Sequence, residues 1–136
     1  EKLIPLIIKK AIKMEKIPIY GNGKNIRDWL FVQDHINALF LAAIHGKAGD
    51  RYCIGGNNEK SNLEIAKYIC KTLDNIFPEK KSHEKLITFV SDRPGHDFRY
   101  AINNSLIKSK LGWVPEYSFE KGIKETILWY VNNNKI

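Results

Sequence analysis

Apolar residues recur along this chain in two patterns, one typical of helices and one typical of short strands. Helical spacing is present over residues 2–13, 35–45, 61–76, 103–111 and 118–131. Short apolar runs lie between glycines and polar residues and predict strands at 17–20, 26–32, 51–54 and 86–90. This mixture of helices and short strands predicts an α/β fold.

Polar residues and glycines mark where several of these elements begin and end. Ser61 is a suitable N-cap, and Glu64 three residues later completes a capping box. Gly112 is expected to stop the helix before it. Asp34 is expected to cap or open the helix that follows it.

The helix at 35–45 is apolar nearly all round, and the short apolar strand 51–54 follows closely. This pattern suits burial in an α/β layer beside parallel strands. The rest of the chain offers few such strands, so we expect residues 34–55 to pack against a sheet that is mostly missing. The alternative is the central helix of a small α+β domain. The chain also begins with Glu1 rather than Met, which favours a fragment of a longer protein.

The bulk composition fits one folded domain. The chain has 136 residues, of which 43% are hydrophobic, enough for a real core. Its net charge of +7 raises the question of a nucleic-acid partner. The basic residues are spread out, however, and no nucleic-acid-binding motif is present. We therefore expect an anionic small molecule and no nucleic acid.

Membrane and metal sites are also unexpected. No apolar run approaches the length of a membrane span, and no signal peptide is visible. Cys53 and Cys70 belong to no CxxC or metal-spaced set. We interpret them as buried free thiols rather than a disulfide, and we expect a cytoplasmic protein.

The densest polar run is SDRPGHDFRYAIN, at residues 91–103. Its charged residues and histidine flank a Pro-Gly pair, which favours a turn that aims its neighbours at one point: Asp92, Arg93, His96, Asp97 and Arg99. Arginine suits phosphate because its planar fork donates parallel hydrogen bonds. The alternative is a salt-bridged turn, in which Arg93 pairs with Asp92 and Arg99 pairs with Asp97.

Six segments of the chain resemble one family in order and at similar spacing. They are EKLIP (1–5), PIYGNG (18–23), IRDWLFVQDH (26–35), GDRYCIGGNNEKSN (49–62), DRPGHDFRYAI (92–102) and LGWVP (111–115). Together they resemble the C-terminal part of the dTDP-glucose 4,6-dehydratases, which are extended short-chain dehydrogenase/reductases. The sequence departs from the usual family residues at Phe31, Gln33 and Cys53.

The resemblance implies a reaction and a fold. Such enzymes convert dTDP-glucose to dTDP-4-keto-6-deoxyglucose and water in deoxysugar synthesis, for example of rhamnose. They oxidise the sugar at C4 with NAD, eliminate water across C5 and C6, and return the hydride to C6. The full-length protein is expected to be a homodimer. The fold implied here is the substrate-binding part, with residues 34–55 completing a Rossmann domain that this chain lacks.

The residues for NAD binding and catalysis lie upstream in this family. This sequence contains no glycine-rich GxxGxxG turn. The YxxxK spacing occurs at Tyr20/Lys24 and Tyr117/Lys121, and we interpret both as chance matches. We therefore expect NAD to bind outside this chain and no catalytic residue within it.

The resemblance assigns nucleotide-binding roles residue by residue. Lys2 and Leu3 correspond to a wall near the thymine, and Pro18 and Tyr20 correspond to the platform for the base. The remaining positions surround the diphosphate and ribose: Arg27, Asn62, Arg93 and His96 as contacts, with Asp92, Pro94 and Gly95 shaping the loop. Asn62 is placed at a helix N-terminus, where backbone N–H groups favour phosphate.

Each role has a structural alternative. Tyr20 could be an ordinary core residue, Arg27 could pair with Asp28, Asn62 could be a plain cap, and His96 could bond a neighbouring carbonyl. At the level of function, two alternatives are an enzyme of the same superfamily acting on another nucleotide sugar and a stand-alone nucleotide-sugar-binding module.

Overall fold

A computed structural model describes residues 2–80 and 82–133, so Glu1 of the first motif lies outside it. The helices are α1 (Leu3–Ile12), α2 (Val32–His45), α3 (Asn62–Ile76), α4 (Ser105–Leu111) and α5 (Phe119–Asn133), with a 3₁₀ turn at His83–Leu86. The strands are β1 (Ile17–Tyr20), β2 (Ile26–Asp28), β3 (Glu59–Ser61) and β4 (Ile87–Val90).

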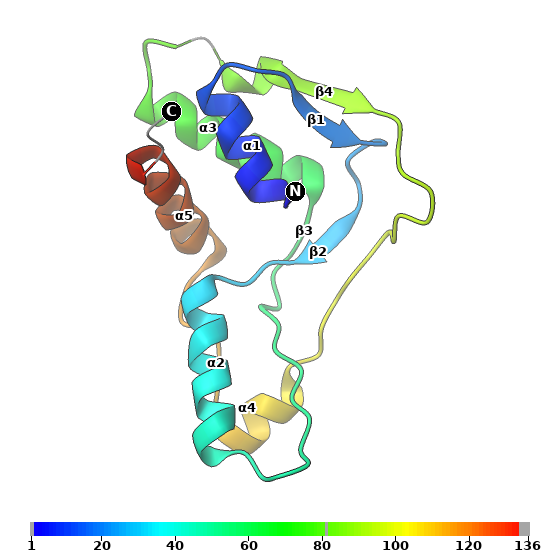
Figure 1. The fold of residues 1–136 in the computed structure, drawn as a ribbon, viewed down its shortest axis with the longest axis vertical. Coiled ribbons are helices and arrows are strands. Elements are labelled where there is room, and N and C mark those ends of the chain that lie inside the picture. The colour runs from blue at the N-terminus through cyan, green and yellow to red at the C-terminus, as the bar shows by residue number, and fades with distance from the viewer. Residues whose placement is uncertain (1, 81, 134–136) are drawn as a thin grey trace.

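The larger part of the molecule is built on a parallel pair of strands. β1 and β4 run in the same direction, in register from Ile17 opposite Ile87 to Tyr20 opposite Val90. Figure 1 shows α1 and α3 beside this pair, with α5 next to them. The main core lies between these elements and is formed mostly by isoleucine and leucine: Ile7, Ile8, Ile17, Ile19, Ile65, Ile69, Leu73, Ile123 and Ile127.

A short antiparallel pair leads into α3. β2 and β3 pair from Ile26 opposite Ser61 to Asp28 opposite Glu59. The predicted capping box is confirmed, because the Ser61 side chain accepts the N–H of Glu64 and the Glu64 carboxylate accepts the N–H of Ser61. Strand β3 was not predicted, since its sequence EKS carries no apolar alternation.

The helices α2 and α4 form the opposite end of the molecule (Figure 1). A small cluster of Ala38, Ile107 and Trp113 joins them. The predicted stop at Gly112 is confirmed, since this residue ends α4 with a φ of +71° that glycine tolerates without strain. No helix among the described residues is long and apolar enough to cross a membrane.

Asp34 does not cap the helix, which begins two residues earlier at Val32. The Asp34 side chain is 1% exposed and accepts the backbone N–H groups of Glu116 and Tyr117, at 3.0 and 3.1 Å. Its own carbonyl accepts the indole N–H of Trp113 at 3.2 Å. Asp34 therefore holds residues 113–117, the segment before α5, against α2 by hydrogen bonds.

Helix α2 is not a central helix within the described residues. Its apolar residues are largely exposed, from 50% to 66%: Val32, Ile36, Leu39, Phe40 and Ile44. The alternative, a small α+β domain built around this helix, is therefore wrong for the described residues.

Two strand predictions were also wrong. The strand expected at 26–32 ends at Asp28, because β3 opposes only three residues of it. Residues 51–54 form no strand, since no described strand lies beside them to accept their hydrogen bonds. Cys53 is accordingly exposed rather than buried. Cys70 is buried, and burial raises the pKa of its thiol to about 12.

The contacts of Asp34 make a testable prediction. Asp34→Ala leaves the part-buried N–H groups of Glu116 and Tyr117 without this acceptor, and should lower the free energy of unfolding by about 1–3 kcal/mol. Denaturant unfolding measures the change. The control is Gln33→Ala on the same helix, which loses one exposed hydrogen bond to Asn37 and should change stability by less than about 0.5 kcal/mol. Equal stability of the two variants would contradict this role.

Candidate functional site

The parallel strands β1 and β4 bring two loops to the same edge. Both strands run in one direction, so Tyr20 at the end of β1 lies beside the segment that follows Val90 at the end of β4. This segment, residues 91–103, is called the polar loop. The N–H of Gly21 donates to the carbonyl of Val90 at 2.9 Å. A Cβ atom at residue 21 would lie only 3.0 Å from Oδ2 of Asp92, and Gly21 has a φ of +56°. Glycine therefore permits both the turn and the close approach of the loop.

The predicted Pro-Gly turn is confirmed. The N–H of His96 donates to the carbonyl of Arg93 at 3.3 Å, with Pro94 and Gly95 between them. Gly95 has a φ of +68°, as a type II turn requires at its third position. The turn is exposed, so its shape comes from its backbone preferences rather than from packing.

His96 is held beneath this turn. Its side chain is 6% exposed, and Nδ1 lies 2.7 Å from Oδ1 of Asp92. An ionised carboxylate only accepts hydrogen bonds, so Nδ1 carries the hydrogen and Nε2 remains for another partner. The bond from His96, together with the N–H of Arg93, holds the pKa of Asp92 below its usual range. The alternative partner for His96, a neighbouring carbonyl, is therefore wrong.

The aromatic ring of Tyr20 lies edge-on to the His96 ring, with centroids 6.3 Å apart. Tyr20 is 44% exposed, so it is not an ordinary core residue. Its exposed ring next to a histidine and a charged loop is a surface on which a planar group can stack.

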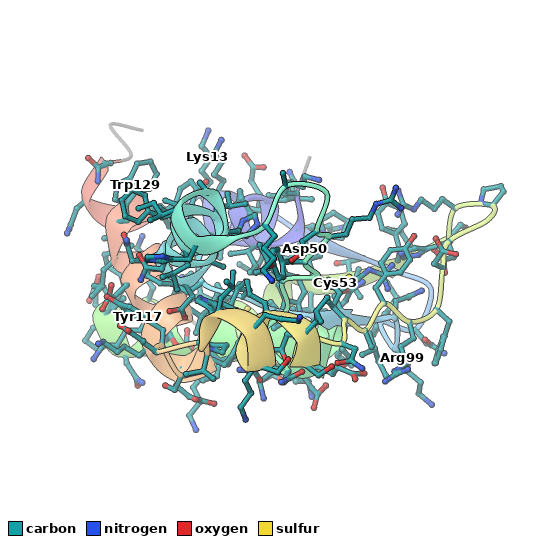
Figure 2. All side chains as sticks on the ribbon, turned by 90° about the horizontal axis from the view of Figure 1, so that it is seen from below. Lys13, Asp50, Cys53, Arg99, Tyr117 and Trp129 are labelled. Carbon is teal, nitrogen blue, oxygen red and sulfur yellow. The ribbon has the colours of Figure 1, made fainter. Side chains whose placement is uncertain are left out.

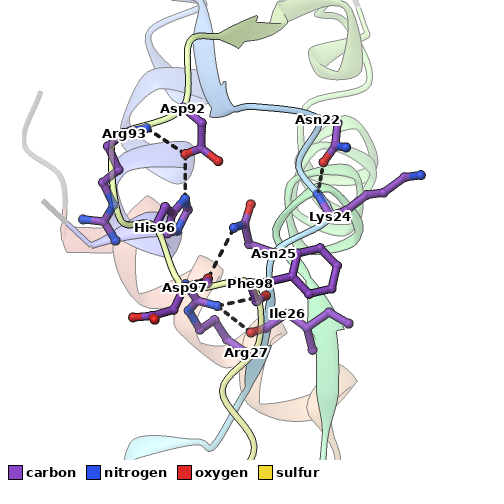
Figure 3. A network of polar contacts seen from close by, with 10 residues as sticks. All are labelled: Asn22, Lys24, Asn25, Ile26, Arg27, Asp92, Arg93, His96, Asp97 and Phe98. Carbon is purple, nitrogen blue, oxygen red and sulfur yellow. Dashed lines mark hydrogen bonds and ion pairs between the residues drawn. The ribbon is translucent and has the colours of Figure 1, made fainter.

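Arg27 reaches across to the same loop (Figure 3). Its Nη2 donates to the carbonyl of Asp97 at 2.9 Å, and its Nη1 contacts the carbonyls of Ile26 and Phe98 at 2.6 and 3.5 Å. Its guanidinium also lies over the ring of Tyr100, 4.4 Å from the centroid. Arg27 therefore binds the backbone of the loop and does not pair with Asp28.

Asp28 has a separate structural task. Its carboxylate accepts the N–H groups of Asn57 and Asn58, at 3.3 and 2.8 Å. A Cβ at Gly55 would lie 2.5 Å from Oδ2 of Asp28, and one at Gly56 would lie 2.3 Å from the carbonyl of Trp29. The glycine pair of the GGNNE motif is therefore required for close packing around Asp28.

Asn62 is the first residue of α3 and is 8% exposed, and Ser61 is the cap. The plain capping role for Asn62 is therefore wrong. The N–H groups of Asn62 and Leu63 donate to the carbonyls of Asn25 and Gly23, both at 3.0 Å. These amides are thus already bonded, and the contribution of Asn62 to an anion site would have to come from its side chain.

Asn25 is a site residue that the sequence did not reveal. It is 5% exposed, and its side-chain amide donates to the carbonyl of Asp97 at 3.3 Å, while its own carbonyl accepts the N–H of Asn62. Figure 3 shows the bond from Asn25 to Asp97 in the polar loop. Through its bond with Asn62, Asn25 joins this loop to the start of α3. An asparagine between a turn and a strand carries no signal of such long-range bonds.

Ion pairing in the loop differs from the alternative of a salt-bridged turn. Arg99 forms a bidentate salt bridge with Glu59, in which Nε and Nη2 each donate to one carboxylate oxygen at 2.7 Å. It does not pair with Asp97. Arg99 and Trp129 lie on opposite sides of the molecule in Figure 2. Arg93 meets Asp92 only through its backbone N–H. Within the described residues its exposed guanidinium has no salt bridge, so its charge remains available to an anion.

The remaining candidates lie elsewhere. Lys2 precedes α1 and lines an apolar cavity of about 820 Å³, whose walls come mainly from α1, α5 and the segment around Trp29. Leu3 packs against the main core, and Pro18 is half-buried in β1. The structure thus brings Tyr20, Arg27, Asn62 and the polar loop together, whereas no described contact joins Lys2, Leu3 or Pro18 to them.

The arrangement suits the binding of an anionic ligand. It offers cationic groups, an aromatic ring and a buried histidine at the ends of two parallel strands, where anionic ligands are often bound. It does not fit NAD, because no glycine-rich turn joins a strand to a helix in the described residues and the Gly55–Gly56 pair is closed by packing.

Known proteins share the sequence and the fold of this chain. Residues 1–126 match the family described as GDP-mannose 4,6 dehydratase. The chain is 52% identical to dTDP-glucose 4,6-dehydratase 1 of Escherichia coli K12, over 99% of this chain and 37% of that protein. It thus spans about two fifths of the length of the curated relatives it matches.

Solved structures show the same fold. A dTDP-glucose 4,6-dehydratase from Bacillus anthracis in complex with NAD matches with a TM-score of 0.86 and 45% identity, over 97% of this chain and 40% of that one. The enzyme from Streptomyces venezuelae with NAD and TYD bound matches with a TM-score of 0.88 and 34% identity, over 97% of this chain and 39% of that one. The fold is therefore a mixed α/β arrangement found as a part of extended short-chain dehydrogenase/reductases. The chain belongs to the GDP-mannose 4,6 dehydratase family, and within it the chain resembles the dTDP-glucose 4,6-dehydratases.

Proposed function

We propose that this chain is the C-terminal, nucleotide-sugar-binding part of a dTDP-glucose 4,6-dehydratase. The whole enzyme would convert dTDP-glucose to dTDP-4-keto-6-deoxyglucose and water. The observation that carries the proposal is 52% identity over 99% of the chain, which includes the whole polar loop after β4. The role of this chain would be to bind and orient the substrate.

The proposed binding mode combines the family resemblance with the geometry of the loop. The exposed ring of Tyr20, next to Pro18, would support the base, and Lys2 and Leu3 would form a wall near it. The diphosphate and ribose would lie against a second set of residues: Arg27, Asn62, Arg93 and His96. Asp92, Pro94 and Gly95 would hold the loop in shape.

NAD would be bound outside this chain, whose residues do not fit it. When bound there, it would accept the hydride from the sugar and later return it. The residues described here would bind the diphosphate, orient the sugar toward that part of the protein and exchange no proton with it.

The exposed face of α2 supports a further part of the proposal. We propose that residues 34–55 pack against a Rossmann domain in the same protein. Phe40 is 66% exposed and Leu39 is 52% exposed, and such a contiguous apolar face is costly in water. About three fifths of the length of the matched relatives lies outside the aligned region, which is enough to cover this face.

The packing of α2 can be tested in the full-length protein. Phe40→Ala should lower the free energy of unfolding by about 3 kcal/mol, because the ring would be buried against the rest of the protein. Trp129→Ala is the control, because Trp129 is 60% exposed on α5 and is not part of the proposed face. It should cost less than about 1 kcal/mol. If both variants are as stable as the parent in thermal unfolding, the face does not pack there.

The phosphate site makes a second prediction. Arg93→Ala should weaken dTDP binding by the full-length protein about ten- to a hundredfold, because it removes a charged hydrogen bond worth about 1.5–3 kcal/mol. Isothermal titration calorimetry measures the affinity. Arg51→Ala is the matched control, because Arg51 is an exposed arginine outside the loop, and it should bind dTDP like the parent. Unchanged affinity in Arg93→Ala would show that the loop does not bind phosphate.

The activity itself is tested by substrate choice. The full-length protein with NAD should form a 4-keto-6-deoxy sugar from dTDP-glucose, measured as the 4-keto product by mass spectrometry. UDP-glucose and GDP-mannose should give at most a few per cent of that rate. Faster turnover of either would replace dTDP-glucose with another nucleotide sugar in the proposal.

A further inference from the structure

Tyr100 contacts both the loop and the arginine that holds it. Its ring lies under the guanidinium of Arg27, 4.4 Å from the charged carbon. Its hydroxyl donates to the side chain of Asp97, the residue whose carbonyl accepts Nη2 of Arg27. Tyr100, Arg27 and Asp97 therefore form a closed triangle of contacts.

The backbone fixes the position of Tyr100 within this triangle. Its N–H donates to the carbonyl of Ile26 at 3.0 Å, and the N–H of Ile26 donates to the carbonyl of Phe98 at 2.7 Å. Arg99, between them, pairs with Ile26 as an isolated parallel bridge. Backbone hydrogen bonds on both sides therefore fix the position of Tyr100, although the residue is 53% exposed. Burial therefore does not explain where the ring lies.

The hydrogen-bond donors of Arg27 that bind no backbone carbonyl indicate a role for the ring of Tyr100. A guanidinium has five N–H groups. Three contacts go to the backbone carbonyls of Ile26, Asp97 and Phe98, which leaves the Nε donor and one Nη2 donor for a ligand. A planar ring against one face of the guanidinium fixes the plane in which these remaining donors point.

We infer that Tyr100 is a positioning residue for the proposed phosphate site, which aims the remaining donors of Arg27 at the diphosphate. This inference rests on the proposed function. It assigns Tyr100 no contact with the ligand. Loss of the Tyr100 ring should therefore weaken the binding of a ligand that carries the diphosphate. It should leave the binding of the nucleoside alone unchanged.

The test compares dTDP with thymidine as probes of the full-length protein, by calorimetry. Tyr100→Leu should weaken dTDP binding about fivefold, because a stacked cation and its alignment are lost. Thymidine binding should stay within about twofold of the parent, since thymidine carries no phosphate. Tyr100→Phe keeps the ring and should restore most of the dTDP affinity. The control is Tyr52→Leu, which removes the hydrogen bond from the hydroxyl of Tyr52 to Asp50, outside the polar loop. This variant should bind both dTDP and thymidine like the parent.

A double-mutant cycle gives a second readout. In an Arg27→Ala background, Tyr100→Leu should have no further effect on dTDP affinity, because the group that it positions is gone. An equal loss for dTDP and thymidine, no loss for either, or a full effect in the Arg27→Ala background would overturn the inference. A parent protein that binds thymidine as tightly as dTDP would overturn the phosphate site as well, and so would distinguish failure of the proposed function from failure of the role of Tyr100.

Discussion

The parallel pairing of β1 with β4 is the constraint on which the candidate site depends. It places the ends of two strands that are far apart in sequence at one edge, with Tyr20 opposite Val90. The glycine turn after β1 and the polar loop after β4 are then forced together, and Gly21 lets Asp92 approach it. Core packing by α1, α3 and α5 stabilises this pair, so the site is carried by the main hydrophobic core.

Most polar groups near the site bind the protein's own backbone. Asn25 and Arg27 donate to loop carbonyls, Asp28 accepts loop amides, and the first amides of α3 are already bonded. The bonds of Asn25 and Arg27 restrain the polar loop without a ligand, and such preorganisation lowers the entropy cost of binding. The groups left over, on Arg93, His96 and one edge of Arg27, are those with which the proposed diphosphate would bond.

Local signals predicted the local parts of this structure well. The capping box of Ser61 and Glu64, the stop at Gly112 and the Pro-Gly turn each depend on residues close in sequence, and all were confirmed. The failures involve distant partners. Asp34 is a residue type that often caps helices, but it accepts amides more than eighty residues away. Residues 51–54 have strand composition, but no strand of the described part of the chain lies beside them. The hydrogen bonds of Arg27 and Asn25 to Asp97 could not be predicted either, because Asp97 is at least 70 residues away in the sequence. The roles of Lys2, Leu3 and Pro18 remain predictions, since they rest on resemblance and no described contact joins them to the loop.

The most direct test of the central claim is a crystal structure of the full-length protein with dTDP bound. The account predicts that the diphosphate oxygens lie within hydrogen-bond distance, about 2.7–3.2 Å, of the side chains of Arg93 and Arg27. The base should then lie against the ring of Tyr20. Density for the nucleotide with its diphosphate out of contact with Arg93 and Arg27, and with the polar loop empty, would contradict it.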